Sequence, residues 1–221
     1  MDSANLYLDD IDLGRYLTTA ECRKCGAESC KDLVEKLVER GLDLPDLAGV
    51  ASEKRRVLEA VADMKEVLPG VPKSPNPRPG PLGLTPLNKP VDGDPILVTG
   101  NNVFTQEVLM TVLSTTSKPL FFLSSDTRGD TLDMAVILGT FTADTVQNAF
   151  EAEGLIENAR TSPLLIPGHA AKFAESIGAA TGRQVDVGPV CAAELPLFYG
   201  EAVEDHGTID RPRRIQEHAP D

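Results

Sequence analysis

Three cysteines lie within nine residues near the start of the chain, and this feature most constrains the fold. Cys22, Cys25 and Cys30 have a C-x2-C-x4-C spacing, which brings three thiolates onto one tight turn. Gly26 lies between them and can adopt the left-handed conformation that such a turn requires. Because thiolates favour soft metals, the spacing predicts an iron–sulfur cluster or a zinc site, with inert or redox-active thiols as the remaining interpretation.

The fourth cysteine, Cys191, is far away in the sequence. An isolated cysteine often packs as a small buried side chain, so we expect Cys191 at the start of the last helix and not among the ligands. In a reducing compartment, a cluster of cysteines is more typical of metal binding than of a disulfide framework. The fourth ligand of a cluster or of zinc therefore has to come from another residue type or from outside the protein.

Composition limits the class of protein. The chain has 221 residues, of which 41% are hydrophobic, enough for one large or two small cores. No apolar run approaches the roughly 18 residues of a membrane span, and residues 1–5 do not resemble a signal peptide. A net charge of −13 opposes binding to phosphate backbones. We therefore expect a soluble cytoplasmic protein that binds neither membranes nor nucleic acid.

Prolines are concentrated between Val67 and Asp94, which predicts a semi-rigid, extended linker over residues 69–91. This linker divides the chain into a small helical domain over residues 1–68 and a second domain over residues 92–203. The remaining segment, 204–221, is acidic and contains proline, and we predict a disordered tail.

The first domain is predicted to be a helical cap around the cysteines. Apolar residues recur at helical spacing directly after Cys30, and Gly41 is a suitable end for that helix. A second apolar set between Val57 and Leu68 also fits one helical face. So small a core is weakly stable by itself, and a bound cluster would constrain it.

The second domain alternates short apolar runs with helical periodicity, which predicts a Rossmann-like α/β fold with a parallel sheet. The expected strands are 96–98, 120–123, 164–166 and 185–187, and the expected helices are 106–113, 131–138, 143–153, 170–180 and 192–198. Ligands of such folds bind beyond the carboxyl ends of the strands. The loops at those ends consist of small and polar residues and together predict one polar crevice.

Two common enzyme classes, dehydrogenases and hydrolases, are poorly supported by the sequence. No Gly-x-Gly-x-x-Gly segment follows the first strand of the second domain, which disfavours a nicotinamide-dependent dehydrogenase. No serine or cysteine nucleophile has a convincing histidine partner, which disfavours hydrolysis.

Both domains resemble one family, the large (gamma) subunit of the corrinoid iron–sulfur protein of the acetyl-CoA synthase/decarbonylase system. The matching motifs lie within residues 14–40 and 94–200: Tyr16-Leu17, Cys22-x2-Cys25-Gly26-x3-Ser29-Cys30, Pro95-Ile96-Leu97-Val98-Thr99, Asp126-Thr127-x-Gly129, Gly139-Thr140-Phe141-Thr142, Leu165-Ile166-Pro167-Gly168, Val187-Gly188-Pro189 and Leu195-Pro196-x-Phe198. The family's fourth cluster cysteine corresponds to the Asp46-Leu47 region. The family also has a TIM-barrel domain where this chain has the proline-rich segment.

The resemblance implies two cofactors, cobalamin and an iron–sulfur cluster of the 4Fe-4S or 3Fe-4S type. The metal ligands would be Cys22, Cys25 and Cys30 with Asp46, while Asp43 or a non-protein ligand are alternatives for the fourth position. The candidate cofactor-binding residues are Thr99, Asn101, Asn102, Thr105, Asp126, Thr127, Thr131, Gly139, Thr140, Phe141, Pro167, Gly168, Gly188 and Pro189. For the asparagines, ordinary turn and cap chemistry is the alternative.

By this resemblance, the expected function is that of a methyl carrier in an anaerobe's one-carbon metabolism. Cobalamin would carry the methyl group for a partner methyltransferase or corrinoid-protein subunit, and the cluster would supply electrons for cobalt reduction. No Asp-x-His-x-x-Gly segment is present, so base-off binding without a protein ligand is expected. The alternatives are an electron-transfer or regulatory module that no longer binds cobalamin, and a zinc-stabilised docking cap.

Overall fold

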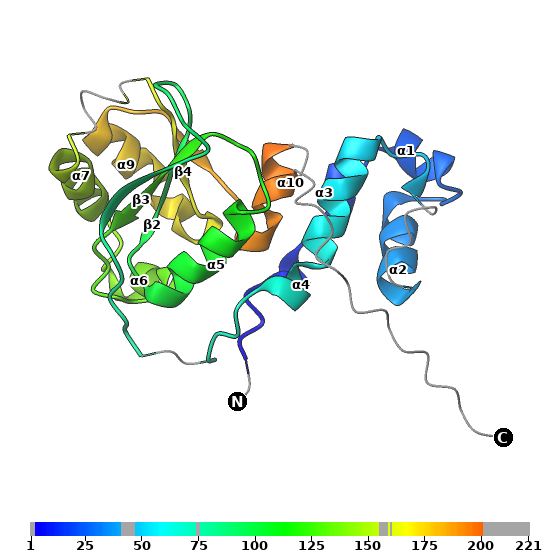
Figure 1. Cartoon of the computed structure of the whole chain (residues 1–221), viewed down its shortest axis with the longest axis horizontal. Coiled ribbons are helices and arrows are strands. Elements are labelled where there is room, and N and C mark those ends of the chain that lie inside the picture. Colours follow the sequence, from blue (N-terminus) through cyan, green and yellow to red (C-terminus); the bar gives the residue numbers. More distant parts are fainter. Residues whose placement is uncertain (1–2, 41–46, 74–75, 155–158, 160, 201–221) are drawn as a thin grey trace.

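The computed structural model describes residues 3–40, 47–73, 76–154, 159 and 161–200. A five-stranded sheet has helices on both faces, and the helices of the N-terminal part pack beside it (Figure 1). The predicted α/β class is therefore confirmed. No helix in these ranges is long and apolar enough to cross a membrane.

The sheet contains the four predicted strands and one further strand, in the order β1-β3-β2-β4-β5. Strands β2 to β5 run parallel to one another, as predicted. The bounds are β1 (Gly83–Leu87), β2 (Ile96–Gly100), β3 (Leu120–Ser125), β4 (Leu164–Ile166) and β5 (Val185–Val187). The short apolar runs of the sequence mark β2, β3 and β4 well, because these strands are almost wholly buried.

Strand β1 lies inside the segment that we predicted to be a linker, and this part of the prediction needs correction. It pairs antiparallel with β3, with Leu84 opposite Leu123. Pro86 lacks the N–H that a central strand would need, and it is tolerated because β1 is at the edge of the sheet. A proline-rich composition alone therefore did not distinguish an edge strand from a spacer.

Each predicted helix of the second domain is present, although two of them begin with a 3₁₀ turn. The elements are α5 (Val103–Leu113), α6 (Leu132–Leu138), α7 (Ala143–Ala152), η4 (Gly168–Phe173) continuing into α9 (Ala174–Thr181), and η5 (Ala192–Glu194) continuing into α10 (Leu195–Tyr199). Asn102 and Thr142 accept hydrogen bonds from the first turns of α5 and α7. Gly139 ends α6 at φ +72°, a conformation that favours glycine.

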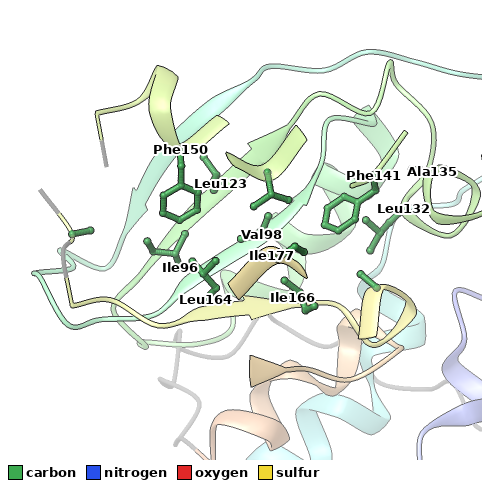
Figure 2. Close-up of a cluster of buried hydrophobic side chains, with 13 residues drawn as sticks. Ile96, Val98, Leu123, Leu132, Ala135, Phe141, Phe150, Leu164, Ile166 and Ile177 are labelled. Carbon is green, nitrogen blue, oxygen red and sulfur yellow. The ribbon is translucent and has the colours of Figure 1, made fainter. Parts of the chain in front are cut away.

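The two faces of the sheet have separate cores, because successive side chains of a strand point in opposite directions. Ile96 and Val98 of β2 pack with α6, α7 and α9 in one core. Figure 2 shows this core, with Phe141 near one end and Phe150 near the other. Leu97, between them in β2, packs with α5 and the η5–α10 segment in the other core.

The N-terminal part is helical, as predicted. It contains η1 (Leu8–Asp10), η2 (Leu13–Tyr16), α1 (Thr19–Lys24), α2 (Cys30–Arg40), α3 (Ser52–Ala62) and α4 (Met64–Val67). Its core joins Cys22, Leu33 and Leu58 with Leu197 from α10, and Met64 belongs to the core on the α5 face of the sheet. The two predicted domains therefore contact each other through shared apolar residues, with α10 next to α3 (Figure 1).

A buried polar contact reinforces this junction. The hydroxyl of Tyr16 donates to Oε1 of Glu194 over 2.6 Å, and Glu194 is only 4% exposed. Arg15 lies 3.7 Å from the same carboxylate oxygen. Burial, followed by the hydrogen bond to Glu194, raises the pKa of Tyr16, so this phenol stays protonated and keeps donating.

The core cluster in Figure 2 leads to a prediction about stability. Phe141 is fully buried there, so Phe141→Ala should lower the free energy of unfolding by about 3–5 kcal/mol. Urea unfolding followed by far-ultraviolet circular dichroism would measure the change. The control is Ile137→Ala, because Ile137 is 73% exposed and should change stability by no more than about 0.5 kcal/mol. Equal effects of the two substitutions would contradict the assigned core.

Candidate functional site

A cavity of about 460 Å³ lies at the carboxyl edge of the sheet. The chain passes from β2 to β3 on one side and then to β4 on the other. The order of the strands thus reverses around β2, and ligands of α/β proteins bind at such a switch point. Residues that end or follow β2, β4 and β5 line this cavity, which we call the switch-point cavity.

Part of the predicted cofactor-binding set lines the switch-point cavity. These residues are Thr99, Thr105, Thr131, Pro167, Gly188 and Pro189. Between them the wall is apolar, with Leu97, Val108 and Leu165. The structure therefore brings together candidates that are up to 90 positions apart, from Thr99 to Pro189. The wall is largely apolar, as is typical of small-molecule sites, and it also contains charged side chains, which are Asp9, Asp10, Lys73 and Asp133.

Two polar atoms in this cavity have no hydrogen-bond partner among the described residues. They are Oγ1 of Thr99, whose residue is fully buried, and Nε2 of His169. A buried polar group without a partner costs free energy. Such groups in a cavity wall are suited to a ligand that supplies the missing hydrogen bonds.

Asn101, Asn102 and Thr127 have a different role. Oδ1 of Asn101 accepts from the backbone N–H groups of Thr127 and Gly129 over 3.0 and 3.1 Å, and from Oγ1 of Thr127 over 3.1 Å. Asn102 donates to the carbonyl of Gly129 over 2.6 Å and caps α5. These side chains tie the loop after β2 to the loop after β3. The contacts of the two asparagines are therefore those of turn and cap residues, the alternative to ligand binding given above.

Three further candidates, Asp126, Gly139 and Thr140, line a second cavity of about 400 Å³. It lies between the loop after β3 and α7, with Arg128 and Glu153 in its wall. Asp126 accepts from the backbone N–H of Arg128 over 2.8 Å, and Thr140 donates to Asp130 over 3.1 Å. The predicted single crevice is therefore divided into two hollows.

The last two candidates, Phe141 and Gly168, line neither cavity. Phe141 is a core residue, as described above. A Cβ on Gly168 would lie 2.8 Å from Cγ2 and 2.9 Å from the backbone nitrogen of Val190. Gly168 thus permits the loops after β4 and β5 to approach each other, which positions the wall of the switch-point cavity.

One side of this cavity consists of N-terminal residues, and no sequence pattern predicts them as part of the site. Tyr7 packs edge-on against His169, with 4.5 Å between ring centres, and its hydroxyl donates to Asp133 over 2.9 Å. Burial, followed by this hydrogen bond, raises the pKa of Tyr7 to about 12. Burial alone would raise the pKa of the Asp133 carboxyl. Hydrogen bonds from Thr131 and Tyr7 outweigh burial, so this pKa is lowered.

The three-cysteine turn has the predicted backbone. Cys22 lies in α1, Cys25 caps its end, and Gly26 adopts φ +76°, which returns the chain so that Cys30 can begin α2. Cys22 and Cys30 form a disulfide with 5.2 Å between their Cα atoms, and Cys25 is a free thiol. This pair corrects our expectation that the clustered cysteines would not form disulfides: the turn brings the two Cα atoms within bridging range.

No group of three histidine, cysteine or acidic side chains is placed to hold a metal ion in the part of the chain that the structure describes. Asp43 and Asp46 belong to the segment 41–46, outside the described residues. The metal site therefore stays a prediction. Cys191 is 2% exposed at the start of η5, as expected, and burial raises the pKa of its thiol to about 11.

Comparison with known proteins identifies the family of this chain. The model for the CO dehydrogenase/acetyl-CoA synthase delta subunit matches residues 27–199. The gamma subunit of the acetyl-CoA decarbonylase/synthase complex from Methanopyrus kandleri is 31% identical over 116 residues, which are 52% of this chain and 25% of that relative.

Two further relatives have similar values. The gamma 2 subunit from Methanosarcina thermophila is 31% identical over 115 residues, 51% of this chain and 25% of its own length. The gamma subunit from Archaeoglobus fulgidus is 32% identical over 113 residues, 51% of this chain and 24% of its own length. The chain thus spans about a quarter of the length of these relatives.

The hydrogen bonds of Asn101 generate a prediction. Asn101→Ala should leave the N–H groups of Thr127 and Gly129 without their acceptor and lower the free energy of unfolding by about 2 kcal/mol or more. Urea unfolding would measure it. The control Asn148→Ala removes an exposed amide from the wall of the second cavity and should change stability by no more than about 0.5 kcal/mol. An equally small effect at Asn101 would contradict its role in joining the loops.

Proposed function

The chain belongs to the family of the CO dehydrogenase/acetyl-CoA synthase delta subunit, and from this membership we propose that it is a corrinoid iron–sulfur protein of the acetyl-CoA pathway. We propose that it holds cobalamin, whose cobalt carries a methyl group for a partner methyltransferase. An iron–sulfur cluster at the three-cysteine turn supplies electrons for cobalt reduction. The finer assignment, to the large (gamma) subunit, is supported by relatives that bear that name.

The observation that carries this proposal is the switch-point cavity, in which a mainly apolar wall contains unpartnered polar atoms of Thr99 and His169. A corrinoid has a broad ring with methyl groups and several amide arms. The apolar wall suits the ring, and isolated hydroxyl and imidazole groups suit the amides. The residues of this chain therefore fit the cofactor that the family implies.

The chain's own residues would bind and orient the corrinoid, while the cofactor supplies the chemistry. Thr99, Thr105 and Thr131 offer hydroxyl groups from three different elements around the cavity. The close approach of the loops at Gly168 fixes the position of Gly188 and Pro189. We expect the cobalt to have no protein ligand, since the His-ligated type of corrinoid motif is absent from the sequence.

The cysteines also fit the second cofactor. Cys22, Cys25 and Cys30 come from one turn around Gly26, and iron–sulfur clusters are held by thiolates. The disulfide between Cys22 and Cys30 must be reduced before both sulfurs can become ligands. We propose Asp46 as the fourth ligand of this site. We also expect the protein to act in the cytoplasm of an anaerobe.

A second candidate function is an electron-transfer or regulatory module that no longer binds cobalamin. One observation favours it: N-terminal residues form one side of the switch-point cavity. In that case the cysteine turn would retain its cofactor without a corrinoid partner site in the same chain.

Titration with cobalamin tests the proposed function directly. The anaerobically purified full chain should bind cobalamin and give the visible spectrum of the base-off form. Thr99→Val should weaken binding about three- to tenfold, because it removes one hydrogen-bonding hydroxyl from the cavity at constant shape. Thr111→Val, whose hydroxyl bonds within α5 to Glu107, should leave the dissociation constant unchanged. If the unaltered chain shows no binding, the second candidate function is favoured.

Metal analysis tests the cysteine turn. After reduction of the Cys22–Cys30 disulfide with excess dithiothreitol and anaerobic reconstitution with iron and sulfide, the protein should show broad visible absorption. Cys25→Ser should lower the iron content by about half or more because clusters depend on thiolate ligands. Cys191→Ser should retain the full iron content. Unchanged iron in Cys25→Ser would exclude the proposed ligand set. Bound zinc without visible absorption would favour the docking cap.

A further inference from the structure

We infer that residues 3–10 form a movable cover over the switch-point cavity, and that this cover must lift before a large ligand can enter. We call this segment the strap. Its residues Ala4 to Tyr7, with Asp9 and Asp10, contribute one wall of the cavity. The opposite walls come from the ends of β2, β4 and β5, so the strap lies over the place where α/β proteins bind their ligands.

The strap is attached by a few polar contacts around the cavity. Tyr7 donates to Asp133 over 2.9 Å and packs against His169. The thiol of Cys191 donates to the carbonyl of Leu6 over 3.2 Å. At its beginning, the N–H of Ala4 donates to the carbonyl of Val71 over 2.7 Å.

The same segment contributes little to the apolar cores. Leu8 packs, partly buried, against the core on the α5 face of the sheet, but none of residues 3–10 is buried and Tyr7 is 38% exposed. Segments that bury little apolar surface and are held by exposed hydrogen bonds open at low cost compared with the core. The strap therefore has the features of a part that can detach while the sheet remains folded.

The backbone of the strap is strained at its point of contact. Leu6 and Tyr7 have successive positive φ angles of 57° and 63°. Bulky residues adopt this left-handed conformation rarely and at a cost in free energy. The closed position is thus maintained by the contacts of Tyr7 and Leu6 against local strain, and lifting the strap releases that strain.

The groups beneath the strap explain why it would open for a ligand. Oγ1 of Thr99 and Nε2 of His169 have no partner among the described residues while the strap is closed. A ligand could form hydrogen bonds with these two atoms, which the closed strap does not do. The closed strap forms one wall of the cavity of about 460 Å³, so a ligand as large as a corrinoid and the closed strap compete for this space. That competition rests on the proposed function, whereas the movement of the strap does not.

Alkylation of Cys191 tests the movement without any cofactor. Cys191 is 2% exposed and contacts the strap, so N-ethylmaleimide should reach it mainly when the strap lifts. Tyr7→Ala removes both the hydrogen bond to Asp133 and the ring contact with His169, and should increase the labelling rate at least about fivefold. Peptide mass spectrometry separates Cys191 from the other cysteines. Gln147→Ala is the control, because it removes an exposed contact with Glu151 on α7, on the other face of the sheet, and its rate should be unchanged.

Cobalamin titration of the same full-length proteins completes the test. If the strap competes with the corrinoid, Tyr7→Ala should bind cobalamin at least about fivefold more tightly, since less of the protein is in the closed state. Equal labelling of Cys191 in the unaltered chain and Tyr7→Ala would overturn the movable cover. Faster labelling with unchanged cobalamin affinity would overturn its gating role. Faster labelling with no cobalamin binding in either protein would support the cover and overturn the proposed function instead.

Discussion

The burial of β2 on both faces is the constraint on which the structure depends. All five of its residues are buried, from Ile96 to Gly100. Ile96 and Val98 need one layer of helices and Leu97 needs another, so both faces of the sheet must be covered. The same strand then ends at the switch point, where Thr99 is held in the cavity wall. The packing that stabilises the fold thus also determines where a ligand can bind.

Buried hydrogen bonds maintain the shape of that edge. Asn101 and Asn102 join the loops after β2 and β3, and Gly168 lets the loops after β4 and β5 meet. These residues therefore act on the site by positioning its walls. This distinction separates candidates that can contact a ligand, such as Thr99 and Thr131, from neighbours whose polar groups are already paired.

The sequence predicted the parts of the fold that depend on local patterns. The runs at 96–98, 120–123 and 164–166 became strands because buried parallel strands are continuously apolar. Gly26 gave the left-handed turn between the cysteines. Strand β1 was missed because its pairing with β3 is a long-range contact in a proline-rich segment. The strap was missed for the same reason, since Tyr7 and Asp133 are 126 positions apart. Sequence periodicity describes single elements, and it contains little information about which distant segment will cover a cavity.

The segment from Cys191 to Leu197 connects the regions that matter for function. Cys191 bonds to the strap, Glu194 accepts from Tyr16, and Leu197 enters the core of the cysteine-containing helices. Leu195, two residues before Leu197, packs on the α5 face of the sheet. Because η5 and α10 form one short helical segment, the contacts of Glu194, Leu195 and Leu197 cannot shift independently. The relation between the cysteine turn and the switch-point cavity is therefore fixed by packing along this segment, where a proline-rich spacer alone would have left the two parts free to separate.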